Sequence, residues 1–208
     1  AFSGESDAVT NATFTGVSFR DFFRSAIKAG GSGAGIEIAR CSFERCNLER
    51  TSNFSTIDIL DGTLDLSDSI FTNCQRGVVI SSPAGAHNVF SDIGFHSVTG
   101  GTVRLTATGS ATNTFSRCTF INNQTGSENT LKNASPGILL SGDFAAVLNV
   151  SDCVFDRCEI IDLEYGMVAA LCNGSSGARI NVSRCKFTNG RYTPQRTNSQ
   201  GVYTASYN

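Results

Sequence analysis

Residues 150–158 read VSDCVFDRC, an apolar residue, two polar residues and a cysteine, followed by Phe155 and a second cysteine. The pattern is an apolar residue, two spacers, a small or apolar residue, one spacer, phenylalanine, two spacers, and a cysteine or small residue. Six other copies occur, with variations: FTGVSFRDF at 14–22, IARCSFERC at 38–46, LSDSIFTNC at 66–74, FSDIGFHSV at 90–98, FSRCTFINN at 115–123 and VSRCKFTNG at 182–190. Self-similarity at a period of about 20 to 50 residues indicates a solenoid or a related repeat array.

The central phenylalanines of the seven copies lie 24, 28, 24, 25, 35 and 32 residues apart. A second short, β-rich run, often opened by glycine, lies between most copies, as in GVVIS from Gly77 and GTVRLT from Gly101. The best helical candidate, RDFFRSAIKA at 20–29, occupies the place of such a run. Leucine-rich and propeller repeats need other patterns or longer periods. The sequence therefore predicts an all-β fold, a right-handed parallel β-helix (solenoid) of about seven coils.

We expect one domain over residues 1–208, with a repeat core at about 11–205. Coils of a parallel β-helix stack at the interstrand spacing of about 4.8 Å, so equivalent residues form columns along the axis. One inward column is predicted to contain Phe19, Phe43, Phe71, Phe95, Phe120, Phe155 and Phe187. Stacked aromatic pairs of this kind add about 0.5–1.5 kcal/mol each beyond area burial.

The residue before the first cysteine position is predicted to lie in an exposed bend, where charges of neighbouring coils meet. Four of the five neighbouring pairs in this column have opposite signs; its members are Arg40, Asp68, Asp92, Arg117, Asp152 and Arg184. The coil lengthens mainly after the second cysteine position, at 47–53, 122–136 and 188–200. These insertions should share one edge of the solenoid, whereas the other corner is rich in Gly, Ser and Ala. Local function is expected on the edge with insertions.

The motif resembles the repeats of the pectin-lyase-like superfamily of right-handed β-helices. It is most similar to the Phe- and Asn-containing repeats of polymorphic outer-membrane proteins and similar surface proteins. The resemblance covers about residues 11–205. It implies a fold rather than one activity, because the superfamily includes polysaccharide lyases and hydrolases, phage tailspikes, adhesins and coat proteins.

The sequence lacks the residues that the resemblance would require of an enzyme. Pectin hydrolases of this fold carry Asn-x-Asp, Asp-Asp, Gly-His-Gly and Arg-x-Lys, and these do not occur here in order. The group of carboxylates that comes closest to a catalytic cluster contains Asp58, Asp61, Asp65 and Asp68. We expect these residues to form a bend and to face solvent; the alternative is that they bind a cation or form a catalytic pair. His87 and His96 are interpreted as surface residues. We predict no enzymatic activity, no cofactor and no metal.

The eight cysteines contain no Cys-x-x-Cys pair and so do not indicate a zinc site. Their column positions predict stacked thiols or disulfides between neighbouring coils, with Cys46–Cys74 as the preferred bond. The candidates are Cys46, Cys74, Cys118, Cys153 and Cys185.

Seven Asn-x-Ser/Thr sequons predict N-linked glycans. The acceptors are Asn11, Asn53, Asn123, Asn133, Asn149, Asn173 and Asn181. Occupancy is expected above all at Asn53, Asn133 and Asn173, which lie in long or Gly-rich segments. Asn149 and Asn181 hold equivalent positions on successive coils and should point outward.

Composition and charge bear on the cellular compartment of the protein and on its binding partners. The net charge is −2, and no basic stripe indicates nucleic acid or an anionic membrane. No apolar run is long enough to insert into a bilayer. The chain starts at Ala1 without an initiator methionine or a signal peptide, as expected of a processed product or of a fragment. Together with the sequons, this favours an extracellular or cell-surface glycoprotein; a bacterial surface protein with incidental sequons is the alternative.

The leading hypothesis is a non-enzymatic structural glycoprotein, a surface coat or filament subunit that stacks head to tail with its own copies. The last segment, 201–208, reads as an uncovered strand, so assembly is assigned to Gly201, Val202, Tyr203 and Tyr207. A heterologous contact of this kind does not close and yields a filament. Three other interpretations stay open: a fragment of a longer β-helix, a carbohydrate-active or carbohydrate-binding module of the lyase, hydrolase or tailspike kind, and an ice-binding surface.

Overall fold

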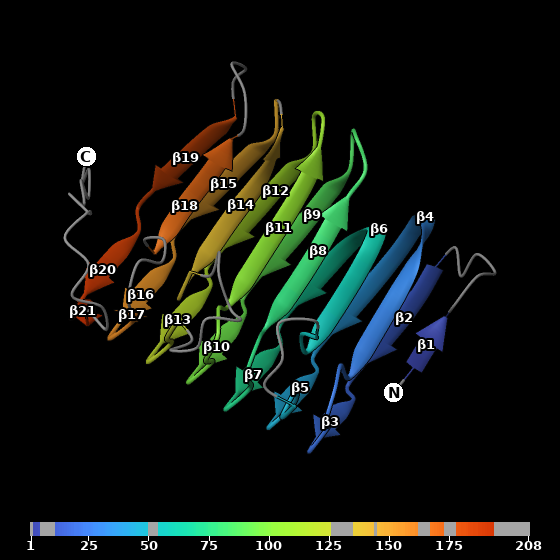
Figure 1. Cartoon of the computed structure of the whole chain (residues 1–208), viewed down its shortest axis with the longest axis horizontal. Helices are drawn as coiled ribbons and strands as arrows, with labels where there is room; N and C mark the ends of the chain where they lie inside the picture. Colours follow the sequence, from blue (N-terminus) through green and yellow to red (C-terminus); the bar gives the residue numbers. More distant parts are fainter. Residues whose placement is uncertain are drawn as a thin grey trace.

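A computed structural model of the protein describes residues 2–4, 11–49, 54–125, 135–143, 145–161, 167–172 and 178–193. Strands are the only regular secondary structure in these ranges, and every strand pair is parallel. The strands lie side by side along the long axis of the molecule (Figure 1). The predicted parallel β-helix is therefore confirmed. The described part of the chain contains no helix that is long and apolar enough to cross a membrane.

A seven-stranded sheet contains the centre of each motif copy. Its strands are β3 (Ser18–Arg20), β5 (Ser42–Glu44), β7 (Ile70–Thr72), β10 (Gly94–His96), β13 (Thr119–Ile121), β16 (Val154–Asp156) and β20 (Lys186–Thr188). The register places each phenylalanine opposite the next, for example Phe95 opposite Phe120. Neighbouring rings stack with centroids 4.5 to 5.0 Å apart. The single inward phenylalanine column is confirmed.

A twelve-stranded sheet forms the other two faces of the coil. Strands that precede the motif centre are β2 (Asn11–Thr15), β9 (His87–Ser91), β12 (Thr112–Ser116), β15 (Val147–Ser151) and β19 (Arg179–Ser183). Strands that follow it are β8 (Val78–Ser82), β11 (Val103–Thr108), β14 (Ile138–Asp143) and β18 (Val168–Cys172). The long strands β4 (Ile27–Ala39) and β6 (Ile57–Ser67) belong to both faces. Two small pairings complete the fold, β1 (Phe2–Gly4) with β4 and β17 (Glu159–Ile161) with β21 (Arg191–Thr193).

The predicted strand after each bend is present in six coils; the seventh, from Gly201, lies outside the described residues. The number of complete described coils is therefore slightly below the predicted seven. Two of the opening glycines have a steric cause, because these bends bring backbones of successive coils together. A Cβ on Gly77 would lie 2.3 Å from the Thr102 carbonyl oxygen, and one on Gly137 would lie 2.1 Å from that of Met167.

The bends on both sides of the seven-stranded sheet have left-handed backbone conformations. All six charged residues of the predicted column have φ between 46° and 58° and are exposed. Asp92 and Asp152 each bind the arginine of the next coil through two hydrogen bonds, to Arg117 and Arg184. A second left-handed column, with φ between 49° and 59°, precedes the second cysteine position: Asp21, Arg45, Asn73, Ser97, Asn122, Arg157 and Asn189. The predicted exposed bend is confirmed, and the backbone shows why short polar residues are common there.

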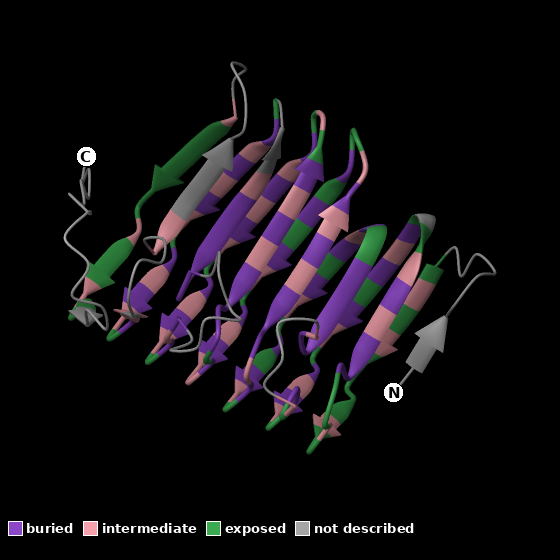
Figure 2. Cartoon of the chain, in the orientation of Figure 1, coloured by how far each residue is buried: buried purple, intermediate pink, exposed green. Residues whose placement is uncertain are grey.

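Buried positions recur from strand to strand along the stack (Figure 2), and several of these columns contain like residues. Phe90 and Phe115 form a second stack, with centroids 4.2 Å apart. Ile57, Val78, Val103 and Ile138 lie opposite one another and are buried. Asn88 and Asn113 form a buried polar pair, in which Asn88 Nδ2 donates to Asn113 Oδ1 at 2.8 Å. The core therefore runs the length of the described stack rather than forming a single central cluster.

Candidate functional site

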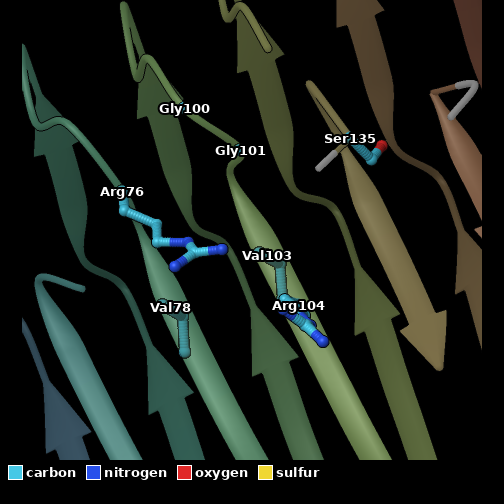
Figure 3. A pocket seen from close by; sticks show the side chains of 7 residues that line it. All are labelled: Arg76, Val78, Gly100, Gly101, Val103, Arg104 and Ser135. Carbon is cyan, nitrogen blue, oxygen red and sulfur yellow. The ribbon is translucent and has the colours of Figure 1, made fainter. Parts of the chain in front are cut away.

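A small hollow lies where β8 and β11 begin, on the sheet face that follows the motif (Figure 3). Its volume is about 190 Å³, counted out to its open mouth. The residues that line it are Arg76, Val78, Gly100, Gly101, Val103, Arg104 and Ser135. We call this feature the arginine hollow, because the charged groups among its described lining residues are two guanidinium groups from successive coils.

Arg76 comes from the bend before β8 and is 6% exposed. Its backbone carbonyl accepts a hydrogen bond from the Thr56 amide at 2.8 Å, which fixes the start of its side chain. Burial lowers the pKa of the Arg76 guanidinium, the charge of Arg104 lowers it further, and the charge of Asp58 opposes both. Arginine nevertheless remains protonated in proteins, so Arg76 is a buried cation.

Arg104 is an outward residue of β11, opposite Val79 of β8 and Leu139 of β14. The residue is half-buried, and its Nε atom is buried without a hydrogen-bond partner in the described part of the chain. None of the ion pairs between described residues involves Arg104. A buried N–H without a partner is uncommon in proteins and calls for an explanation.

Asp58 is a described carboxylate that acts on Arg76 electrostatically. It is an outward residue of β6, in the same row as Lys28 and Val79, and it is 7% exposed. Burial raises the pKa of Asp58, while the charges of Lys28 and Arg76 oppose that rise. The group Lys28, Asp58, Arg76 and Arg104 therefore has three formal positive charges and one negative charge.

The predicted carboxylate cluster does not converge on one point. Asp58 is buried beside Lys28, whereas Asp61 lies exposed in a left-handed conformation within β6. Asp65 faces outward from the same strand, and Asp68 lies in the exposed bend. Among the described residues, no three His, Cys, Asp or Glu side chains are grouped so that they could hold a metal ion.

The two histidines do not line the arginine hollow. His87 opens β9 and is exposed, as predicted. His96 is only partly exposed; burial lowers its pKa, and its Nε2 lies 3.4 Å from Thr119 Oγ1. Neither histidine has a described hydrogen bond to a carboxylate, so the described contacts do not form a proton-transfer pair.

The seven cysteines whose side chains the structure describes are free thiols, so the predicted Cys46–Cys74 disulfide is absent. The register explains this correction: equivalent side chains on parallel, in-register coils point the same way. Their Cβ atoms stay near the strand spacing of about 4.8 Å, beyond the usual 3.5 to 4.5 Å or so of a disulfide. The other candidates, Cys118, Cys153 and Cys185, are also unbonded to one another.

The thiols instead donate hydrogen bonds to backbone carbonyls. Cys74 Sγ lies 3.4 Å from the Phe43 carbonyl oxygen and Cys158 Sγ lies 3.3 Å from that of Phe120, in each case on the preceding coil. Burial raises the pKa of Cys158 to about 11. A hydrogen bond with Cys74, together with burial, raises the pKa of Cys46. The raised pKa keeps the Cys46 and Cys158 thiols protonated, and therefore poorly nucleophilic, at neutral pH, whereas the same hydrogen bond with Cys46 lowers the pKa of Cys74.

The sequons divide into surface and interior positions. Asn11 and Asn181 are exposed and Asn149 is half-buried. Asn181 lies opposite Asn149 on the next coil and donates to its Oδ1 at 2.9 Å, which confirms their predicted equivalence. The glycosylation predictions at Asn53, Asn133 and Asn173, and the assembly prediction for Gly201, Val202, Tyr203 and Tyr207, lie outside the described residues.

The structure contradicts the predicted glycan site at Asn123. This residue is fully buried in the column of Cys74 and Cys158. Its Nδ2 donates to the Phe95 carbonyl at 3.0 Å, and its Oδ1 accepts from the Val98 amide at 2.9 Å. A glycan on this nitrogen could not fit in the core, because the side chain is fully buried. Asn123 replaces a cysteine as the side chain that binds the preceding coil.

Sequence reasoning missed the arginine hollow, because Arg76 and Arg104 belong to no motif. The available signal was the alignment of GVVIS with TVRLT, offset by one residue from a match of the opening glycines, which places Arg104 at the outward position of Val79, one coil after Arg76. The bend that turns Arg76 toward β11 is visible only in the structure (Figure 3).

Comparison with known proteins identifies the family of the chain. No curated protein matches the chain. The family described as "right handed beta helix region" matches residues 3–208, which is nearly the whole sequence, and it agrees with the parallel coils of the structure. The chain therefore belongs to the right-handed β-helix family, with the pectin-lyase-like fold.

Proposed function

We propose that this protein is a non-enzymatic, extracellular structural glycoprotein whose coils stack head to tail with those of other copies. The observation that carries the proposal is the open last coil of the described stack. Ile180, Val182 and Phe187 are 38%, 45% and 42% exposed, although their counterparts one coil earlier are buried (Figure 2).

The first coils support the same proposal. Within the described residues, β2 pairs only with β4, and β3 pairs only with β5, so each has one open edge. Phe14 and Phe19 are only partly buried, and Val17 is 37% exposed. Open strand edges next to exposed apolar columns favour pairing with another chain. Because the two ends differ, repeated pairing of one end with the other gives an open assembly.

The side faces support an extracellular, glycosylated protein. Asn11, Asn149 and Asn181 are sequon residues on outward positions, where a glycan would not disturb the core. The described cysteines are mostly buried, so few thiols are accessible to oxidation in an extracellular environment. Intact mass of the native material tests the glycans: we expect a mass above that of the bare chain, and a bare mass would contradict this part of the proposal.

Sedimentation velocity across a concentration series, with negative-stain images, tests the stacking. We expect the native chain to form elongated oligomers, and Val182→Asp to abolish them by placing a charge on the open column. Ile70→Asp is the matched control, because Ile70 is 39% exposed but lies on a side face in the middle of the stack. Circular dichroism checks that both variants fold. Discrete monomers of the native chain at high concentration, or equal loss of assembly in both variants, would contradict the proposal.

A further inference from the structure

The arginine hollow brings two cations of successive coils to one small space. Figure 3 shows Arg76 at the start of β8, with its guanidinium directed toward β11, from which Arg104 projects. The charge of Arg104 acts directly on Arg76. Two like charges that share a partly buried space repel each other, so the arrangement is stabilised by an anion between them.

The described carboxylates do not supply that anion to Arg104. Asp58 acts on Arg76 and Lys28, but no described carboxylate lies within 4.0 Å of the Arg104 nitrogens. The Arg104 Nε atom is buried and has no hydrogen-bond partner in the described ranges. The exposed arginines of the bends differ, since Arg117 and Arg184 each hold an aspartate through two bonds. Arg104 therefore presents an unused fork of donors.

We propose that the arginine hollow is a binding site for a carboxylate group of a ligand, held by Arg104 and neutralised by Arg104 and Arg76 together. The Nε and terminal NH₂ groups of a guanidinium match the two oxygens of a carboxylate. Bonding through these atoms would satisfy the buried Arg104 Nε. The site lies on the face of β8 and β11, apart from the open ends, so it is independent of the stacking proposal.

The size of the hollow limits what enters it. Its volume of about 190 Å³ includes open space at the mouth, so the enclosed part is far smaller than a pocket that surrounds a whole ligand. Only the acidic group of a larger molecule is expected inside, with the remainder outside the mouth. The carboxylate could come from a sugar acid or from an acidic side chain of a protein, and the two sources can be separated experimentally.

The test follows the arginine Nε–H signals of the full chain by ¹H–¹⁵N NMR during titration with sodium acetate. Sodium chloride at equal ionic strength is the blank. We expect the Arg104 signal, assigned by its loss in Arg104→Gln, to shift saturably with a Kd on the order of 1 mM. Glucuronate and N-acetylglutamate are then compared, and the tighter ligand identifies the source of the carboxylate.

Isothermal titration calorimetry with the tighter-binding of these two ligands measures how much each substitution changes the Kd. Arg104→Gln should weaken binding at least tenfold, and Arg104 is only half-buried, so the variant should fold. Arg179→Gln is the matched control, because it removes the same charge from an exposed residue of β19. It should change the Kd less than twofold. Absence of a saturable Arg104 shift, equal weakening by both variants, or tighter binding of sulfate than of any carboxylate would overturn the proposal.

Discussion

The coils at 150–158 and 182–190 have nearly the same motif but different surroundings. Phe155 is 1% exposed and Phe187 is 42% exposed, although their rings stack 4.8 Å apart with an interplanar angle of 3°. Val150 and Val182 differ in the same way, at 1% and 45%. The motif therefore determines where a side chain points, whereas burial requires a coil on each side. A repeat sequence predicts the column but not the place where the column is covered.

The largest effect is expected at the phenylalanines of these two coils. Phe155→Ala should lower the free energy of unfolding by about 3–5 kcal/mol, because it removes a ring packed on both faces. Phe187→Ala should cost about half as much or less, since its described ring contact is on one face only. Urea unfolding, with the m-value checked for each variant, measures both. Equal costs would show that the two coils are equally covered.

The fall in stability at alkaline pH should depend more on Cys158, in an inner coil, than on Cys185, in the last described coil. Burial raises the pKa of Cys158 to about 11 from the ordinary value of 9.0, so the unfolded chain loses this proton first. The stability from this group is complete below pH 9 and falls as pH rises from 9 to 11, by at most about 3 kcal/mol. Unfolding midpoints between pH 8 and 11 should therefore fall less steeply in Cys158→Ala. Cys185→Ala, at the half-buried position of the last coil, should change the slope less, and an unchanged slope in Cys158→Ala would refute this cause.

A smaller difference in stability is expected between substitutions of two sequon residues, Asn123 and Asn181. Asn123→Ala leaves the Phe95 carbonyl and the Val98 amide without their buried partner, at a cost of about 1–3 kcal/mol. Asn181→Ala removes an exposed side chain of the last coil and should change stability by about 0.5 kcal/mol or less. Thermal unfolding of the unglycosylated chain compares them without interference from glycans. A cost at Asn181 that equals the cost at Asn123 would mean that the buried bonds contribute nothing.

The fold was predictable because its determinants repeat. Phe71, Phe95 and Phe120 recur at regular spacing, and alternation along each short strand fixes their direction inward. The bends were also visible, since charged residues such as Asp92 and Arg117 precede the first cysteine position in successive copies. Each of these features is a property of one coil that the next coil repeats.

The features that were missed depend on relations between coils. Asn123 matches a sequon, but its burial follows from its alignment with Cys74 and Cys158, whose thiols bind carbonyls of the preceding coil. The disulfide prediction used the spacing of the coils but not the parallel direction of the side chains. The arginine hollow required both the register of β11 and the path of the bend at Arg76.

The thiol, amide and ring contacts described above also bear on how the chain folds. Each joins neighbouring coils, whose motif centres lie 24 to 35 residues apart. The first pair of coils therefore closes a loop before any column exists, and this step carries the main entropy cost. Every later coil adds to an edge that is already ordered, so growth is one-dimensional and can start from any adjacent pair. The folding rate is then governed by nucleation of two coils rather than by the length of the solenoid.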